Sequence, residues 1–162
     1  ARFTQTACVL IASADDFHPW QRFFLFYFLP DRRSNWSKME KFLLISTGAI
    51  LGANARYWIG DWAAQKLGAS FPYGTFIINL SGSLLIGFFL TLATERLLID
   101  PRWRLLIAVG FLGAYTTFST FAFESFNLLA KGQWLAGLGN LLGSTVLGVA
   151  AVALGVYLGK AI

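Results

Sequence analysis

The sequence predicts an all-α membrane protein whose four transmembrane helices follow one another along the chain. Of its 162 residues, 56% are hydrophobic and 13% are charged, whereas soluble domains carry roughly a quarter charged residues. From residue 42 onward the chain has four apolar stretches. The length of each is close to the ~20 residues that cross the hydrocarbon of a bilayer. So few charges could not cover the surface of a soluble fold, and a bilayer removes that requirement.

The four predicted spans are separated by short polar links. The spans run approximately over residues 42–62, 73–94, 103–129 and 134–158, and the links over 61–70, 95–102 and 131–133. Aromatic residues fall near the span ends, as in interfacial belts: Trp58, Trp62, Trp103, Trp134 and Tyr157. Lys and Arg favour cytoplasmic termini only slightly, which is compatible with insertion in both orientations.

Residues 1–38 differ from the rest of the chain. They are mixed and polar, and their apolar piece at 23–29 is too short to cross a bilayer. The only methionine, Met39, directly precedes the first apolar run. We interpret residues 39–162 as the membrane domain and 1–38 as an N-terminal extension. The extension is either sequence upstream of the natural start or a cytoplasmic segment that lies on the membrane.

Composition argues against several classes of function. The net charge of +5 invites a nucleic-acid interpretation, but the basic residues form no stripe and lie mostly between apolar runs. One cysteine, Cys8, and one histidine, His18, leave no Cys-based metal cluster and no internal disulfide. We expect no enzyme, because no nucleophile–base pair can be assembled.

The third span carries the most informative polar residues. Gly110 and Gly113 are followed by a run of threonines and serine at 116–120, which is a poor place for an uninterrupted helix. A broken helix at membrane depth exposes backbone carbonyls that can bind a cation and amides that can face an anion. Phe118 and Phe121 are three residues apart and share a helical face. This face either lines an ion path or faces lipid.

Three motifs make the chain similar to a known family. The run Gly-Ala-Tyr-Thr-Thr-Phe-Ser-Thr-Phe at 113–121, with Glu124 after it, resembles the signature of the small Fluc/CrcB fluoride channels. The run 52–57 resembles the first-helix motif, and 72–75 followed by Asn79 resembles the second. The resemblance covers 39–162, whereas 1–38 have no counterpart and Ala114 replaces what is often another glycine.

The resemblance implies a fluoride-selective channel in the cell inner membrane that passively exports fluoride from the cytoplasm. It implies an antiparallel, dual-topology homodimer with two pores, a broken third helix and a central structural Na⁺. The backbone carbonyls of Gly113 and Thr116 would bind that ion, and Arg56 would lie near a vestibule or hold the dimer. The family pattern assigns the fluoride path to Phe118, Phe121, Asn79, Thr117, Ser119, Thr120 and Glu124.

Two other functions stay open on the residues alone. A small four-helix proton-coupled multidrug exporter needs a membrane-embedded carboxylate early in the bundle. The first span has none before Asp61 at its end, and Glu124 lies in the third. A structural accessory subunit would need only the small residues that recur at spacing four, such as Gly48 with Gly52 or Gly155 with Gly159.

Overall fold

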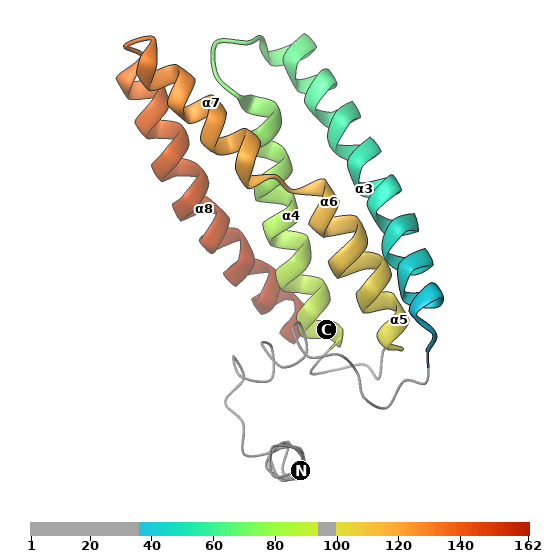
Figure 1. Cartoon of the computed structure of the whole chain (residues 1–162). Helices are drawn as coiled ribbons and strands as arrows, with labels where there is room; N and C mark the ends of the chain where they lie inside the picture. Colours follow the sequence, from blue (N-terminus) through green and yellow to red (C-terminus); the bar gives the residue numbers. More distant parts are fainter. Residues whose placement is uncertain (1–35, 94–99) are drawn as a thin grey trace, which may run out of the picture. The chain divides into compact units, whose positions relative to one another are not determined.

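The computed structural model describes residues 36–93 and 100–162, which belong to one compact unit, Asn35–Ile162. Within these residues every regular element is helical, which confirms the all-α prediction. The elements are α3 (Lys38–Leu67), α4 (Tyr73–Thr91), α5 (Pro101–Trp103), η3 (Arg104–Leu112), α6 (Gly113–Tyr115), α7 (Phe118–Ala130) and α8 (Trp134–Ala161) (Figure 1).

Helix α3 begins and ends at residues with clear local chemistry. At its start Ser37 and Glu40 form a reciprocal capping box: the Glu40 amide donates to Ser37 Oγ at 3.1 Å, and the Ser37 amide donates to Glu40 Oε2 at 2.8 Å. The helix ends before Gly68, whose φ of +82° suits glycine. The predicted link at 61–70 was therefore wrong at its beginning, since Asp61 is helical and accepts from Gln65 Nε2 at 2.8 Å.

Residues just ahead of Met39 contribute to the start of this helix. Ser37 caps it, and the guanidinium of Arg102 lies 5.3 Å from the ring centroid of Trp36. A cation over an indole ring is an attractive contact, here between the entry to α3 and α5. The division of the chain at 38/39 stays a prediction. Residues 1–35 lie outside the described part.

Within residues 36–93 and 100–162, three helical segments are long and apolar enough to cross a membrane. They are Tyr73–Thr91, Pro101–Ala130 and Trp134–Ala161. Helix α3 has the length, 30 residues, but Asn54, Arg56 and the charged residues at its ends lower its mean hydropathy. The end of the predicted second span, Thr94, and most of the link at 95–102 lie outside the described residues. Helix α5 begins inside that link, at Pro101, after Asp100 accepts the Arg102 amide at 2.9 Å.

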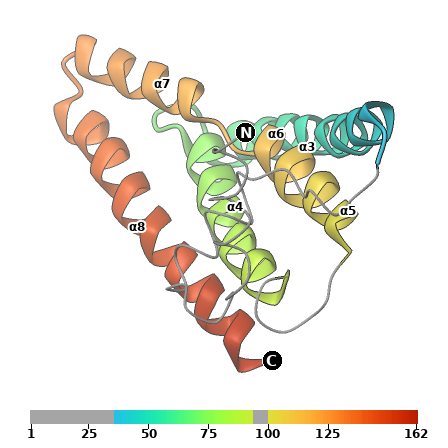
Figure 2. The same ribbon diagram turned by 60° about the horizontal axis from the view of Figure 1, so that its bottom comes forward.

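The third segment changes its packing partner along its length. Its first half, η3 and α6, packs against α3, whereas its second half, α7, packs against α8. Figures 1 and 2 show the two halves on either side of α4, which packs along α8 and also contacts α3. A small core forms where α6 meets α4, from Ile78, Leu112 and Tyr115. The segment therefore crosses α4 at the end of α6.

Helices approach each other closely at some of the glycines that recur at a spacing of four residues. A Cβ added to Gly52 in α3 would overlap the Phe111 carbonyl of η3, and one added to Gly155 in α8 would overlap the Leu84 carbonyl of α4. Both contacts are backbone to backbone, so only glycine permits them. Gly139, in contrast, has open space around the position of its missing Cβ. Gly52 and Gly155 of the spacing-four pattern thus allow close packing of helices within one chain.

Candidate functional site

The helical segment of residues 101–130 is interrupted at two threonines. Thr116 (φ −78°, ψ 157°) and Thr117 (φ −149°, ψ 119°) are both extended, between the end of α6 at Tyr115 and the start of α7 at Phe118. Extended residues leave the helical hydrogen-bond ladder, and buried backbone groups then need other partners. We call residues 116–117 the break.

One side-chain amide of α4 takes over part of the missing ladder. Asn79 Oδ1 accepts from the Thr117 backbone N–H at 2.9 Å, and Asn79 Nδ2 donates to the Thr117 carbonyl at 3.0 Å. A carboxamide matches a peptide group in donor and acceptor, so it can hold both groups of one residue. Thr117 is itself buried. The family resemblance assigned Asn79 to the fluoride path, and the clamp uses one of the two N–H groups of its amide.

The break withdraws the regular helical donors from two carbonyls. In an unbroken helix the Thr117 N–H would donate to the Gly113 carbonyl, but here it donates to Asn79 Oδ1. The Thr120 N–H would likewise donate to the Thr116 carbonyl, but it donates to Thr117 Oγ1 at 3.3 Å as the N-cap of α7. These are the two carbonyls to which the family resemblance assigned a cation.

Two further residues of α4 contact the chain at the break. Ser81 Oγ lies 2.8 Å from the Tyr115 hydroxyl, which ties down the last residue of α6. A Cβ added to Gly82 would overlap the Thr116 methyl group, so glycine makes room for the extended threonine. Asn79, Ser81 and Gly82 of α4 thus each contact a residue at or next to the break.

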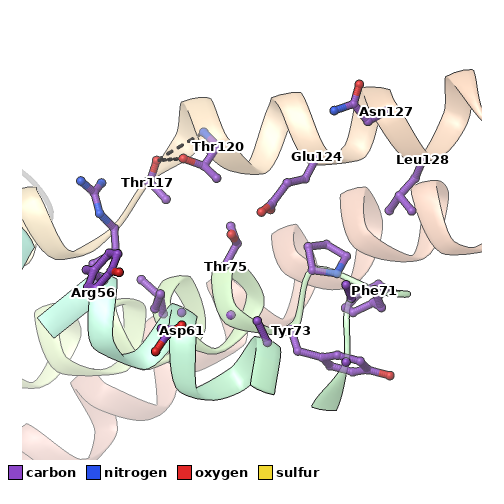
Figure 3. Close-up of a pocket in the computed structure, with 18 of the residues that line it drawn as sticks. Arg56, Asp61, Phe71, Tyr73, Thr75, Thr117, Thr120, Glu124, Asn127 and Leu128 are labelled. Carbon is purple, nitrogen blue, oxygen red and sulfur yellow. Dashed lines mark hydrogen bonds between the residues drawn. The ribbon is translucent and has the colours of Figure 1, made fainter. Parts of the chain in front are cut away.

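A cleft of about 800 Å³ lies beside the break. Residues from the second half of α3, the following link, the first turns of α4 and the whole length of α7 line it. Five predicted site residues are among them: Arg56, Thr117, Ser119, Thr120 and Glu124. Figure 3 shows Glu124 reaching from α7 toward Thr75 of α4, and the carboxylate lies beside the Thr75 hydroxyl. The cleft therefore has a track of hydroxyl groups along one wall, which Thr117, Ser119 and Thr120 form.

Both signs of charge are present in this cleft. Arg56 and Lys131 contribute cations, and Asp61 and Glu124 contribute carboxylates. Among residues 36–93 and 100–162, no group of three His, Cys, Asp or Glu side chains could hold a metal ion.

The two phenylalanines of the third-segment motif contact each other. Their ring centroids are 5.9 Å apart with an interplanar angle of 51°, in agreement with the shared helical face predicted from their spacing. Their surroundings differ, since Phe118 is 78% exposed and Phe121 only 8%. Neither ring lines the cleft. Asn79, Gly113 and Thr116 do not line it either. Thr116 is part of the break, Asn79 binds Thr117 of the break, and Gly113 precedes it in the chain.

Several residues of the site were not predicted. Thr75 and Asp61 line the cleft, although Thr75 was part of a recognised motif and could have been included. Outside the cleft, Ser125 was not predicted either; it is almost fully buried and bonded to Asn140 of α8. A lone serine among apolar residues carries no signal of that kind in the sequence.

One protein family matches most of the chain. Residues 43–156 match the family model described as "CrcB-like protein, Camphor Resistance (CrcB)". The chain belongs to the CrcB family. The match includes α4, the break and the whole of α7, so the clamp and the cleft lie inside the CrcB region.

Relatives in this family match nearly along their whole length. A protein of Chloroflexus aurantiacus is 53% identical over 122 residues, which are 75% of this chain and 97% of that protein. One of Koribacter versatilis is 48% identical, with 70% and 90% covered, and one of Trichormus variabilis is 52% identical, with 73% and 87% covered. Each of these relatives is named "Fluoride-specific ion channel FluC".

Proposed function

We propose that this CrcB-family chain is a fluoride-selective ion channel that lets fluoride leave the cytoplasm passively. The observation that carries the proposal is the break clamped by Asn79, which places the threonine and serine hydroxyls at the wall of the cleft. The names of the relatives support fluoride as the ion. Because those relatives are ion channels, the expectation that the chain is not an enzyme is confirmed.

The chemistry of the site suits a small anion. Fluoride is strongly hydrated, so its passage through a dry region requires close replacement donors. Hydroxyl groups and an amide N–H supply them, and the ring edges of Phe118 and Phe121 carry partial positive charge. Arg56 at the cleft adds attraction for anions. Passive export is useful because HF crosses membranes as a neutral acid and ionises inside the cell.

The deciding experiment is anion efflux from liposomes that contain the purified protein. We expect rapid fluoride efflux, with chloride efflux no faster than in protein-free liposomes and no need for a proton gradient. Equal rates for the two anions would contradict the proposal. Fluoride transport that requires a proton gradient would favour the coupled exporter, for which α3 offers no carboxylate between Glu40 in its first turn and Asp61 near its end.

We also propose that α3 is the fourth span and that two copies form an antiparallel, dual-topology homodimer in the cell inner membrane. Large apolar side chains are exposed on both outer helices, among them Ile50 and Leu51 of α3 and Val146 and Val149 of α8. Exposed apolar surface of this kind needs lipid or another chain to cover it. Arg56 and Asp61 of α3 line the cleft.

The carbonyls of Gly113 and Thr116 are the proposed ligands of a structural Na⁺ at the dimer centre. The support is that the regular helical donors of both carbonyls bond elsewhere, and a cation is a suitable partner for freed carbonyls at membrane depth. Protein prepared without sodium should lose fluoride flux, and added sodium should restore it. Full flux from sodium-free protein would contradict this assignment.

Replacement of the two aromatic rings separates a role in conduction from apolar packing. Phe118→Ile and Phe121→Ile keep apolar volume but remove the positive ring edge, a contact worth about 1 kcal/mol or several-fold in occupancy. We expect both to lower fluoride flux at least that much at equal protein level. The matched control is Phe126→Ile on the same helix, where the side chain is 67% exposed. Wild-type flux in both Phe118→Ile and Phe121→Ile would place the fluoride path on another face of the helix bundle.

A further inference from the structure

A buried chain of hydrogen bonds joins α7 to α8 away from the cleft. Asn140 of α8 is 0% exposed and Ser125 of α7 is 1% exposed. Asn140 Nδ2 donates to Ser125 Oγ at 2.8 Å, and Ser125 Oγ donates to the Phe121 carbonyl at 2.7 Å. On the other side, Ser144 Oγ donates to Asn140 Oδ1 at 3.1 Å. The chain therefore runs from Ser144 to the backbone of Phe121.

The chain has only one consistent direction. The single hydroxyl proton of Ser125 is used on the Phe121 carbonyl, so Ser125 must accept from Asn140. The amide must then present nitrogen to Ser125 and oxygen to Ser144. Because buried polar groups without partners are costly, this arrangement strongly favours one rotation of α7 against α8.

Apolar packing alone specifies the rotation of α7 poorly. The helix carries phenylalanines at 118, 121, 123 and 126, on several sides of its axis. Phe121 is 8% exposed, whereas Phe123 and Phe126 are 66% and 67% exposed. Rings of equal hydrophobicity do not decide by themselves which one points inward. A polar contact that only one register satisfies can make that choice.

The helix also lacks the support that helical continuity would give. The break separates α7 from α6, so its start is held through the Asn79 clamp at Thr117. Its far end turns into α8 through Gly132, with φ +74°. Between these points Leu129 lies close to Gly137, where an added Cβ would be 2.6 Å from its Cδ2. That contact sets the separation of the helices and leaves their relative rotation to the Asn140–Ser125 bond.

We propose that Asn140 is a positioning residue, which acts through Ser125 to fix the rotation of α7 and thereby the orientation of Phe121 and Glu124 toward the conduction path. Its effect on transport rests on the proposed fluoride conduction, whereas its effect on α7 does not. The test therefore measures both. The variants are Asn140→Leu, which is close in volume, Ser125→Ala, and the two combined.

Thr145→Val serves as the control variant. Thr145 lies on the same helix, and its hydroxyl donates to the Leu141 carbonyl of its own helix at 2.7 Å, so its loss leaves α7 untouched. We expect Asn140→Leu to lower fluoride flux per folded protein on the order of tenfold. Amide hydrogen exchange should become faster in residues 118–130 and stay unchanged in α3. Thr145→Val should match the wild type in both measurements.

The double variant distinguishes positioning from general loss of stability. If Asn140 acts through Ser125, Ser125→Ala should lower flux similarly, and adding Asn140→Leu to it should change flux little further. Additive losses, unchanged exchange in α7, or wild-type flux in monodisperse Asn140→Leu would each overturn the inference. If the wild type conducts no fluoride, the proposed function fails, and the exchange of α7 still decides whether Asn140 holds this helix.

Discussion

Asn79→Leu is expected to reduce fluoride flux by about a hundredfold, because it removes two hydrogen bonds and leaves a buried peptide group without its partners. Leucine is close to asparagine in volume, so the packing around α4 is largely kept. The Thr117 N–H and carbonyl would lose their 2.9 and 3.0 Å contacts. The break would then relax toward a helical or disordered form, and the hydroxyl track would lose its position at the cleft.

Asn79→Asp makes the same point with less change in shape. The carboxylate keeps an acceptor for the Thr117 N–H but turns an oxygen toward the Thr117 carbonyl, so we expect it also to lose most of the flux. Asn54→Leu is the control, because Asn54 is exposed and its Nδ2 donates to the Ile50 carbonyl of its own helix at 2.7 Å. Liposome efflux at equal reconstituted protein is the measurement. Flux in Asn79→Leu within threefold of the wild type would show that the clamp is not needed.

Gly155→Ala is expected to destabilise the fold by about 1–3 kcal/mol, a cost typical of overpacking. The added Cβ would overlap the Leu84 carbonyl and lie 2.8 Å from the Phe88 nitrogen of α4. Both are backbone atoms, which cannot move aside as a flexible side chain can. Helices α4 and α8, which pack against each other most extensively, would have to separate. Unfolding in detergent should therefore occur at a clearly lower denaturant concentration or temperature.

Gly139→Ala on the same helix is the matched control. No atom lies within 4 Å of the position of its Cβ, and alanine is the better helix former by about 1 kcal/mol. The unfolding of one subunit should therefore be unchanged or slightly harder. Equal destabilisation by the two substitutions would mean that close approach of α4 and α8 is not what stabilises the fold. Loss of the dimer in Gly139→Ala alone would place this open surface at the contact between copies.

The sequence alone determined the helical class, the approximate helix positions and the family. Apolar runs of membrane-spanning length indicate that the surrounding solvent is lipid, and this can be recognised without knowledge of any tertiary contact. The weak helix-forming run at 113–120 predicted an interruption, and the structure has extended residues at Thr116 and Thr117. The motifs also indicated part of the cleft, since five predicted residues from two separate segments line it together.

Tertiary structure alone decided how each polar residue is used. The sequence contains Asn79 and Asn140 as similar isolated amides, yet one clamps the break and the other joins α7 to α8. It contains Gly139 and Gly155 in the same spacing pattern, yet one is open and the other permits backbone contact. The physical reason is that a hydrogen bond or a close approach depends on which face of a helix meets its neighbour, and that face is fixed only when the helices pack.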